Sequence, residues 1–389
     1  MKFSCATQDF LVSLQLVSRA IGGQQALPIL GNILMDVKGG LCTVSATDLE
    51  LSIITSFDAS IESEGTVTVP AKAILNFVQF NTDPEMVLEV KEGTLVKCTS
   101  KHAKASIAGE ASSEYPTISP VERQTAFSVG MAPLLQALHL VTFASAKTTL
   151  RPVLSGVYMR RNAKGLTFAA TDSYRLSEFS VPMAEAAEDM SCIIPVKVLD
   201  EVKVVLGGIK SDKKEKKPKG EATEGVAAEK DDEVSIALGR QQIEITVGRT
   251  RLLSRLIDGK FPNYEQIVPK ESATTVLLSL TDFMPAVKRM HYFAKEMNNN
   301  LTFHFKQGES RIFTPQTPAG RDEAMLATEV TGSENKIALS SSYLLDFLNH
   351  IDSESVVMHM QDSQHPAVFK IPGNDQYLHL IMPLRMQEE

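Results

Sequence analysis

The residues best suited to chemistry are two Thr-Asp pairs, Thr47-Asp48 and Thr171-Asp172, each at the end of an expected strand. A carboxylate beside a nucleophile and a His can support hydrolysis, so one candidate is a hydrolase that uses Asp172 or Tyr174 with a His from elsewhere in the chain. No His lies near either residue in the sequence. A pair found at two equivalent positions is more simply turn chemistry, in which Asp accepts backbone N–H groups.

Sequence motifs of common enzymes and metal sites do not occur in this chain. It has no GxSxG nucleophile elbow, no phosphate-binding GxxxxGK[ST] loop and no HExxH zinc motif. The eight His residues do not cluster, and the closest pair is His359 and His365. We therefore expect no catalytic site, no metal and no cofactor.

The chain contains three copies of one sequence pattern. FSCATQDFLVSLQLVSRAI begins at Phe3 and recurs in similar form at Phe127, a shift of 124 residues, with a weaker third copy from Val276. In each copy, apolar residues at i, i+1, i+4 and i+7 form one face of a helix. A short strand and a polar or Pro-containing start precede each helix, which is typical of helix entry. Such internal repeats indicate three copies of one structural unit.

Each copy continues with alternating strands, a second helix and more strands. The second helices are expected in the segments that start at Val69, Ile194 and Leu339. This order predicts an α+β fold of three repeated domains, each with helices packed on antiparallel sheets. The expected domains are residues 1–125, 126–271 and 272–389.

One charged segment, Lys210–Glu233, does not belong to the repeat. It has seven Lys, eight acidic residues and no aromatic residue, and it accounts for the 21 residues by which the second copy is longer. Such a composition buries too little apolar surface to order itself. We expect a solvated, disordered insertion rather than a DNA- or partner-binding tail, because its charges nearly cancel.

Composition limits the class of protein. The chain of 389 residues is 43% hydrophobic and 22% charged, with a formal net charge of −8. These values predict a soluble globular protein without a generally basic surface, although a local basic face remains compatible with them. Four scattered cysteines, no signal peptide and no apolar run of membrane-spanning length predict a cytoplasmic protein.

Differences between the copies point to a binding function. Where the first copy has Leu49-Glu50-Leu51, the second has Ser173-Tyr174-Arg175, so the exchange is not required by the shared framework. The second copy also ends in the more apolar segment Gly259–Pro269, and the chain ends in the apolar segment Leu378–Met386. Apolar segments of this kind predict a groove for an extended peptide.

Several of these segments resemble a known family. LPILGN from Leu27, ATDSYRL from Ala170, GKFPNYEQIVP from Gly259 and MPLR from Met382 resemble the bacterial DNA polymerase sliding clamp, the beta subunit of the polymerase III holoenzyme. The motifs occur in the family's order and spacing, over the whole chain except Lys210–Glu233. The resemblance implies three clamp-type domains per chain and a head-to-tail homodimer that closes into a ring.

The function implied by the resemblance is mechanical rather than catalytic. The ring encircles duplex DNA without reading its sequence and tethers the replicative DNA polymerase, which makes synthesis processive. An ATP-dependent clamp loader and other proteins with clamp-binding peptides are further implied partners. The candidate DNA-facing cations lie on or next to the repeated helices: Arg19, Lys72, Lys147, Arg151, Lys197, Lys203, Lys288, Arg289 and Lys295.

The resemblance also implies a partner peptide-binding groove in the second domain and at the chain end. The matching positions are Leu154, Thr171, Tyr174, Arg175, Leu176, Pro262, Ile267, Ser342, Met382, Pro383, Leu384 and Arg385. In this interpretation Arg175 donates hydrogen bonds to peptide carbonyls. Gln387-Glu388-Glu389 extends past the usual end of the family. The remaining alternative is a monomeric three-domain scaffold that binds peptides but not DNA.

Overall fold

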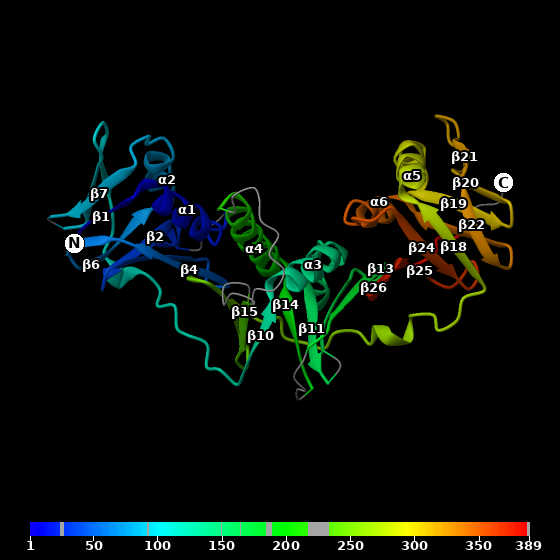
Figure 1. The fold of residues 1–389 in the computed structure, drawn as a ribbon, viewed down its shortest axis with the longest axis horizontal. Coiled ribbons are helices and arrows are strands. Elements are labelled where there is room, and N and C mark those ends of the chain that lie inside the picture. The colour runs from blue at the N-terminus through cyan, green and yellow to red at the C-terminus, as the bar shows by residue number, and fades with distance from the viewer. Residues whose placement is uncertain are drawn as a thin grey trace. The chain divides into compact units, whose positions relative to one another are not determined.

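The computed structural model describes residues 1–23, 27–91, 93–148, 150–163, 165–183, 189–216 and 233–386. The chain forms two compact units, each made of two stretches of sequence (Figure 1). Unit 1 contains Met1–Ala132 and Lys197–Leu256, and unit 2 contains Pro133–Val196 and Ile257–Glu389.

Unit 1 holds two antiparallel sheets with helices packed on them. The smaller sheet has the strand order β5 (Ser60–Ser63), β1 (Lys2–Ala6), β7 (Glu85–Val90), β8 (Leu95–Thr99), β9 (Lys104–Ala108). The larger sheet has the order β10 (Thr125–Gly130), β15 (Glu233–Leu238), β16 (Gln242–Val247), β17 (Thr250–Arg255), β4 (Leu51–Asp58), β3 (Leu41–Thr47), β2 (Asn32–Lys38), β6 (Gly65–Pro70). The helical segments are α1 (Thr7–Ser18), η1 (Pro28–Gly31), α2 (Ala71–Gln79), η2 (Ser112–Glu114) and α4 (Val196–Lys216). Helix α1 contacts α2, β3 and β4, and its fully buried Phe10 lies 5.5 Å from the ring of Phe57.

Unit 2 repeats this plan. Its larger sheet has the order β14 (Met190–Pro195), β11 (Gly156–Asn162), β12 (Gly165–Thr171), β13 (Arg175–Val181), β26 (Asn374–Ile381), β25 (Ala367–Ile371), β24 (Ser355–Met360), β18 (Thr274–Ser279), β22 (Thr328–Gly332). Its smaller sheet has the order β21 (Glu323–Met325), β20 (Glu309–Phe313), β19 (Asn300–Lys306), β23 (Asn335–Ser340). The helical segments are α3 (Met131–Val141), η3 (Thr142–Ala144), η4 (Pro152–Leu154), η6 (Tyr264–Gln266), α5 (Leu280–Ala294), η7 (Lys295–Met297) and α6 (Ser341–Leu348). Helices α5 and α6 lie against each other (Figure 1).

The three repeated strand–helix pairs are confirmed, but their helix entries differ from the prediction. The first amides of α1 and α5 have no hydrogen bond to a capping side chain. Of the second helices, α6 has such a bond, in which Tyr343 N donates to Ser340 Oγ at 3.4 Å. The first amides bond to carbonyls of neighbouring segments: Thr7 N to Pro84 O at 2.9 Å and Leu280 N to Glu354 O at 2.9 Å. Where a strand runs directly into a helix, a carbonyl of a neighbouring segment of the same chain can accept the first amide of the helix. A polar capping side chain is then not needed.

The second helices begin later than their segments, because each preceding strand ends inside the segment. Strands β6 and β14 end at Pro70 and Pro195, and α2 and α4 begin at the next residue. Helix α4 continues to Lys216, so the first part of the charged segment predicted to be disordered is helical. Residues 217–232 of that segment, and Gln387–Glu389, lie outside the described residues. None of the helices described is long and apolar enough to cross a membrane.

The packing units do not coincide with the sequence repeats. In unit 1, β17 from the middle of the chain pairs with β4 from the first repeat. In unit 2, β13 from the middle pairs with β26 at the chain end, from Arg175 opposite Ile381 to Phe179 opposite Tyr377. Each large sheet therefore joins strands of two repeats.

Candidate functional site

The Thr-Asp pairs form tight turns, as predicted. In unit 2, Asp172 Oδ1 accepts the backbone amides of Tyr174 at 2.9 Å and Arg175 at 3.1 Å. In unit 1, Asp48 Oδ1 accepts Glu50 N at 3.1 Å and Leu51 N at 2.8 Å. The residue after each Asp has a left-handed backbone, with φ 83° at Ser173 and 76° at Leu49.

The turn in unit 2 exposes one aromatic side chain and fixes the end of the chain. Tyr174 is 61% exposed, and its carbonyl accepts the amide of Met382 at 2.8 Å. This bond extends the pairing of β13 with β26 past the end of the strand. The turn, Tyr174 and Met382 therefore form one local surface.

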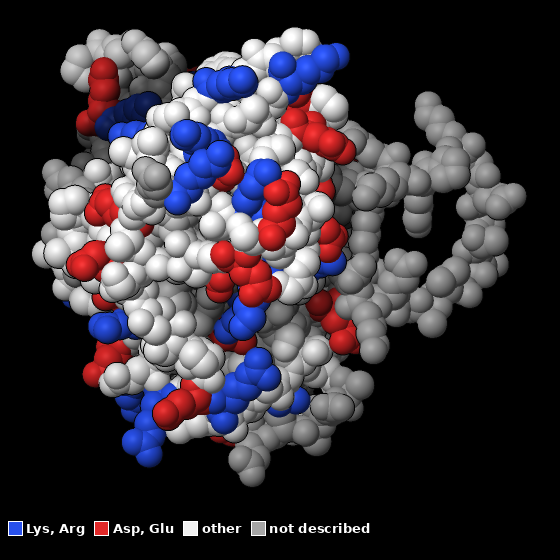
Figure 2. Space-filling view, turned by 90° about the vertical axis from the view of Figure 1, so that its left-hand side faces the viewer, with Lys and Arg blue, Asp and Glu red and all other residues white. Residues whose placement is uncertain are grey.

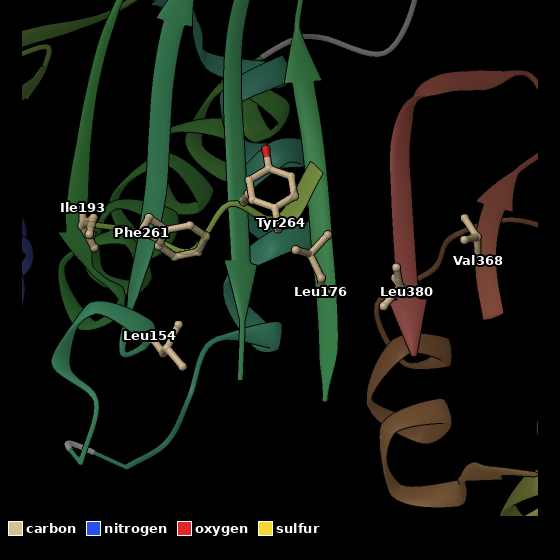
Figure 3. Close-up of a cluster of buried hydrophobic side chains, with 8 residues drawn as sticks. Leu154, Leu176, Ile193, Phe261, Tyr264, Val368 and Leu380 are labelled. Carbon is tan, nitrogen blue, oxygen red and sulfur yellow. The ribbon is translucent and has the colours of Figure 1, made fainter. Parts of the chain in front are cut away.

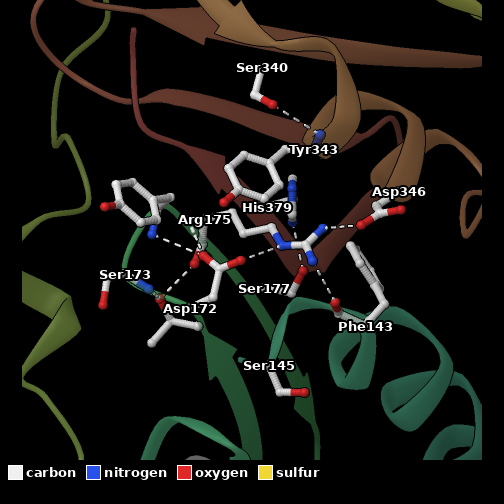
Figure 4. Close-up of polar contacts among 12 residues, drawn as sticks. Phe143, Ser145, Asp172, Ser173, Arg175, Ser177, Ser340, Tyr343, Asp346 and His379 are labelled. Atoms are coloured by element: carbon white, nitrogen blue, oxygen red, sulfur yellow. Dashed lines mark hydrogen bonds and ion pairs between the residues drawn. The ribbon is translucent and has the colours of Figure 1, made fainter. Parts of the chain in front are cut away.

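Arg175 is buried, and its guanidinium is bonded inside unit 2 (Figure 4). Its Nη1 donates to Asp346 Oδ2 at 2.7 Å, its Nε to Asp172 Oδ2 at 3.1 Å, and its Nη2 to the carbonyl of Phe143 at 3.0 Å. The guanidinium carbon lies 4.7 Å from the ring centre of Tyr343 and 5.6 Å from that of Phe143.

These contacts give Arg175 an internal role that the sequence did not reveal. A charge that is only 3% exposed needs such partners, because burying an unpaired charge is costly. The guanidinium connects β13, α6 and η3 through three of its N–H donors. Burial raises the pKa of the neighbouring Tyr343 phenol, and Asp172 adds to that shift, so this ring stays neutral.

Apolar side chains collect beside the turn (Figure 3). The cluster of buried residues consists of Leu154, Ala169, Leu176, Ile193, Phe261, Tyr264, Val368 and Leu380, and the partly buried Met382 packs against it. Phe261 and Tyr264 come from the segment between β17 and β18, and Phe261 stacks on Tyr158 at 5.0 Å. The segments with unusual apolar character in the sequence therefore do meet at one place in unit 2.

The predicted groove residues differ widely in exposure. Those that are buried are Leu154, Thr171, Arg175 and Leu176; those that are partly buried are Ser342, Met382, Pro383 and Leu384; those that are exposed are Tyr174, Pro262, Ile267 and Arg385. Among these predicted groove residues, Tyr174 and Ile267 are large apolar side chains that are exposed, the latter at 45%. A ligand at this surface would thus meet Tyr174, Ile267 and Met382 before it reached the buried leucines.

Sequence reasoning missed Phe143, Asp346 and His379, which surround Arg175 and its strand. Asp346 carried a usable signal, because it is the acidic residue within the otherwise apolar helix sequence SSYLLDFL. Phe143 carried none, since it contributes a backbone carbonyl as its polar contact.

The candidate DNA-facing cations divide between the units. Unit 1 holds Arg19, Lys72, Lys197 and Lys203, and unit 2 holds Lys147, Arg151, Lys288, Arg289 and Lys295. Several are bound to carboxylates: Arg19 to Glu201, Lys197 to Asp48 at 2.8 Å, Lys203 to Asp200 at 2.8 Å, and Arg289 to Asp322 at 2.7 Å. Lys72, Lys288 and Lys295 are exposed on or beside α2 and α5.

Charge on one outer face is mixed in sign. Figure 2 shows Lys and Arg interspersed with Asp and Glu on the face at the left of Figure 1, where β1 and β7 lie. Such a face offers no continuous basic patch to nucleic acid, which agrees with the net charge of −8. Within the described part of the chain, no group of three or more His, Cys, Asp or Glu side chains is arranged to hold a metal ion.

Comparison with known proteins identifies the family. Three family models match in succession: the N-terminal domain of the DNA polymerase III beta subunit over residues 1–119, its central domain over 129–214 and its C-terminal domain over 265–385. The chain therefore belongs to the DNA polymerase III beta subunit family, the sliding clamps, as its motifs predicted.

Whole-chain relatives agree with this assignment. The chain is 26% identical over 396 residues to the beta sliding clamp of Synechocystis sp., covering 99% of this chain and 100% of that protein. It is 24% identical to the beta sliding clamp of Escherichia coli, with the same coverage. The beta subunit structure from Pseudomonas aeruginosa matches with a TM-score of 0.89 at 25% identity, over 99% of this chain and 100% of that chain. The sliding clamp structure from Bacillus subtilis has a TM-score of 0.88 at 22% identity, over 100% of both chains. The predicted α+β fold with three clamp domains is confirmed.

Proposed function

We propose that this chain is a non-catalytic processivity factor that assembles as a head-to-tail homodimer, closes into a ring around duplex DNA and tethers the replicative DNA polymerase. The observation that carries the proposal is the match of all three clamp domains, in order, along one chain. In this proposal the domains are residues 1–125, 126–271 and 272–389.

Unpaired sheet edges support self-association. Strand β9 ends the smaller sheet of unit 1, while β21 and β22 each end a sheet of unit 2. Such edges present free N–H and C=O groups that readily pair with another chain. Two exposed aromatic side chains, Phe80 after α2 at 73% and Tyr292 on α5 at 70%, add apolar surface of the kind that protein interfaces bury. Pairing of a unit 1 edge in one copy with a unit 2 edge in the other would close the ring.

Weak contacts with phosphate suit a ring that must slide. Lysine and arginine bind the DNA backbone without reading bases, so the affinity is similar at every sequence position. Retention then depends on ring opening and not on tight binding. Lys72, Lys288 and Lys295 are exposed, and we place them on the DNA side. Ring opening requires an ATP-dependent clamp loader as a further partner.

The surface formed by Tyr174, Ile267, Met382, Pro383 and Leu384 is our proposed docking site for the polymerase and for other proteins with clamp-binding peptides. Exposed apolar side chains next to the buried cluster favour an extended peptide with Leu or Phe anchors. Leu154 and Leu176 form the floor of the site. Arg175 then acts by holding the turn that presents Tyr174.

The decisive experiment compares circular and linear DNA. Purified protein is loaded on nicked circular plasmid with a clamp loader, and the fraction that stays bound is measured by gel filtration before and after the plasmid is linearised. A topological ring stays on circular DNA even at salt concentrations that abolish ordinary phosphate binding. The same ring leaves the DNA once the plasmid is linearised. Equal retention on both forms would contradict encirclement, and a strictly monomeric mass would instead favour a peptide-binding scaffold.

A further inference from the structure

Three of the eight histidines, His139, His350 and His379, lie near one another in unit 2, and Figure 4 shows His379 beside Arg175 and Ser177. His350, beyond the end of α6, stacks on Phe143 at 4.2 Å and lies 5.0 Å from His139 of α3, measured between ring centres. His379, on β26, stacks on Phe347 at 4.7 Å with an angle of 7° between the rings, and lies 5.4 Å from Phe143. Phe143 thus lies close to both His350 and His379, and its carbonyl also accepts a hydrogen bond from Arg175.

His379 is enclosed and lacks a place for a second proton. The residue is 0% exposed, and its Nδ1 lies 2.6 Å from Ser177 Oγ on β13. Its Nε2 is buried without a hydrogen-bond partner among the residues that the structure describes. Protonation of both ring nitrogens would place a full charge among the rings of Phe143, Phe347 and Phe369, at a high cost in solvation.

The charged groups around His379 oppose its protonation. Burial, followed by Arg175 from β13 and His350 from the end of α6, holds the pKa of His379 well below its ordinary value. The acid nearest to Arg175 on α6, Asp346, is already bonded to that guanidinium at 2.7 Å, and Asp172 is bonded to it at 3.1 Å. Burial raises the pKa of Tyr343 on α6 and of Tyr377 on β26 itself, so both phenols are neutral.

We propose that the His379–Ser177 pair, with Arg175 and His350 beside it, is a proton-sensitive lock on the β13–β26 joint, which mild acidification opens. The folded state keeps His379 neutral, whereas the opened chain has a histidine of ordinary pKa near 6.5. The lock therefore contributes its full stability above pH 6.5 and loses it as the pH falls below that value. The opening equilibrium shifts about fivefold over the first pH unit below 6.5 and about tenfold over each further unit, until the folded state also binds the proton.

Opening of this joint has a predicted consequence at the chain end. Met382 follows β26 directly and is held by Tyr174 O, so a loosened joint disorders both residues. The expected loss of partner binding at low pH rests on the proposed function of this surface. The lock itself does not rest on the proposed function, because its opening is measured on the protein alone, without any partner.

The test is hydrogen–deuterium exchange of the full-length protein at pH 8.0, 6.5 and 5.5, read by mass spectrometry and corrected for the intrinsic rate at each pH. Peptides that contain β13 and β26 are compared with those that contain β1 and β7 of unit 1. We expect protection of the β13 and β26 peptides to fall about fivefold from pH 6.5 to 5.5, beyond any change in unit 1, because at pH 6.5 the opened histidine is already about half protonated. Unchanged protection in the wild-type protein down to pH 5.5 would overturn the proposal.

Variants assign the effect to the lock. His379→Leu with Ser177→Ala removes both partners of the hydrogen bond together, so neither is left unpaired, and should abolish the extra loss of protection. His350→Gln keeps the buried pair and should reduce the loss only in part, which provides a second test if the double variant folds poorly. His365→Gln is the matched control, since His365 is an exposed residue of unit 2 bonded to Asp362, and should behave as wild type. An undiminished loss in both the double variant and His350→Gln would contradict the lock.

Discussion

Replacing Arg175 with Met tests whether the guanidinium holds the joint or serves a ligand directly. The change removes three donors at once and leaves two carboxylates without their partner, Asp172 with a side chain 15% exposed and Asp346 with one 39% exposed. Breaking a buried ion pair costs about 3–5 kcal/mol. Because the Asp346 carboxylate is exposed enough to regain water, we expect a loss of about 2–4 kcal/mol in the free energy of unfolding of unit 2.

Scanning calorimetry measures this loss directly. For a unit of this size, 1 kcal/mol corresponds to about 2–4 °C, so unit 2 of Arg175→Met should melt roughly 5–15 °C below wild type. The matched control is Arg151→Met, which removes an exposed guanidinium from the same unit and a single long contact, 3.4 Å to Ser173 Oγ. That control should melt within about 2 °C of wild type.

A particular outcome would refute this reasoning. If Arg175→Met melts with wild-type stability but loses binding of a clamp-binding peptide, the guanidinium contacts the peptide, as the sequence alone suggested. If instead the variant melts early and binding at low temperature falls only slightly, Arg175 acts through the turn that carries Tyr174.

Three further predictions concern assembly and binding. Light scattering should give a mass about twice 42.5 kDa, and a monomer at micromolar concentration would count against the ring. Lys288→Glu with Lys295→Glu should weaken DNA binding equally for any DNA sequence, and the loss should be smaller at high salt. The dimer should persist. Arg289 is left in place because it is bonded to Asp322. Met382→Ala with Leu384→Ala should lower peptide affinity at least tenfold by calorimetry without changing the dimer, since each buried anchor contributes roughly 1.5–3 kcal/mol.

Local features of the fold were predictable from the sequence. The spacing of Phe10, Leu14 and Val17 marks a helix face, and these three residues are fully buried on α1. The same pattern located α3 and α5, because an amphipathic helix needs only a few neighbouring residues to specify its buried side. The Asp172 turn was predictable for the same reason, since Asp and the amides it accepts are two and three residues apart.

Features that depend on distant parts of the chain were not predictable. Arg175 is bonded to Phe143, 32 residues away, and to Asp346, 171 residues away, and no periodicity connects such positions. The pairing of β13 with β26 was invisible for a related reason, because unpaired strand edges of similar repeats look alike in sequence. The sequence therefore nominated residues for the proposed docking surface without showing which of them are buried.

The two turns show how one framework carries two kinds of chemistry. Both use Oδ1 of the Asp to hold backbone amides, but Oδ2 of Asp48 accepts Lys197, whereas Oδ2 of Asp172 accepts Arg175. At the position of Arg175 in the second repeat, the first has the buried Leu51. The backbone of the turn is the same with either residue, so the turn itself does not require the arginine. It also does not require the hydrogen bonds of that arginine to η3 and α6. A buried charge that costs solvation and is not needed for the turn is best explained by what it holds in place, which in unit 2 is the joint beneath Tyr174 and Met382.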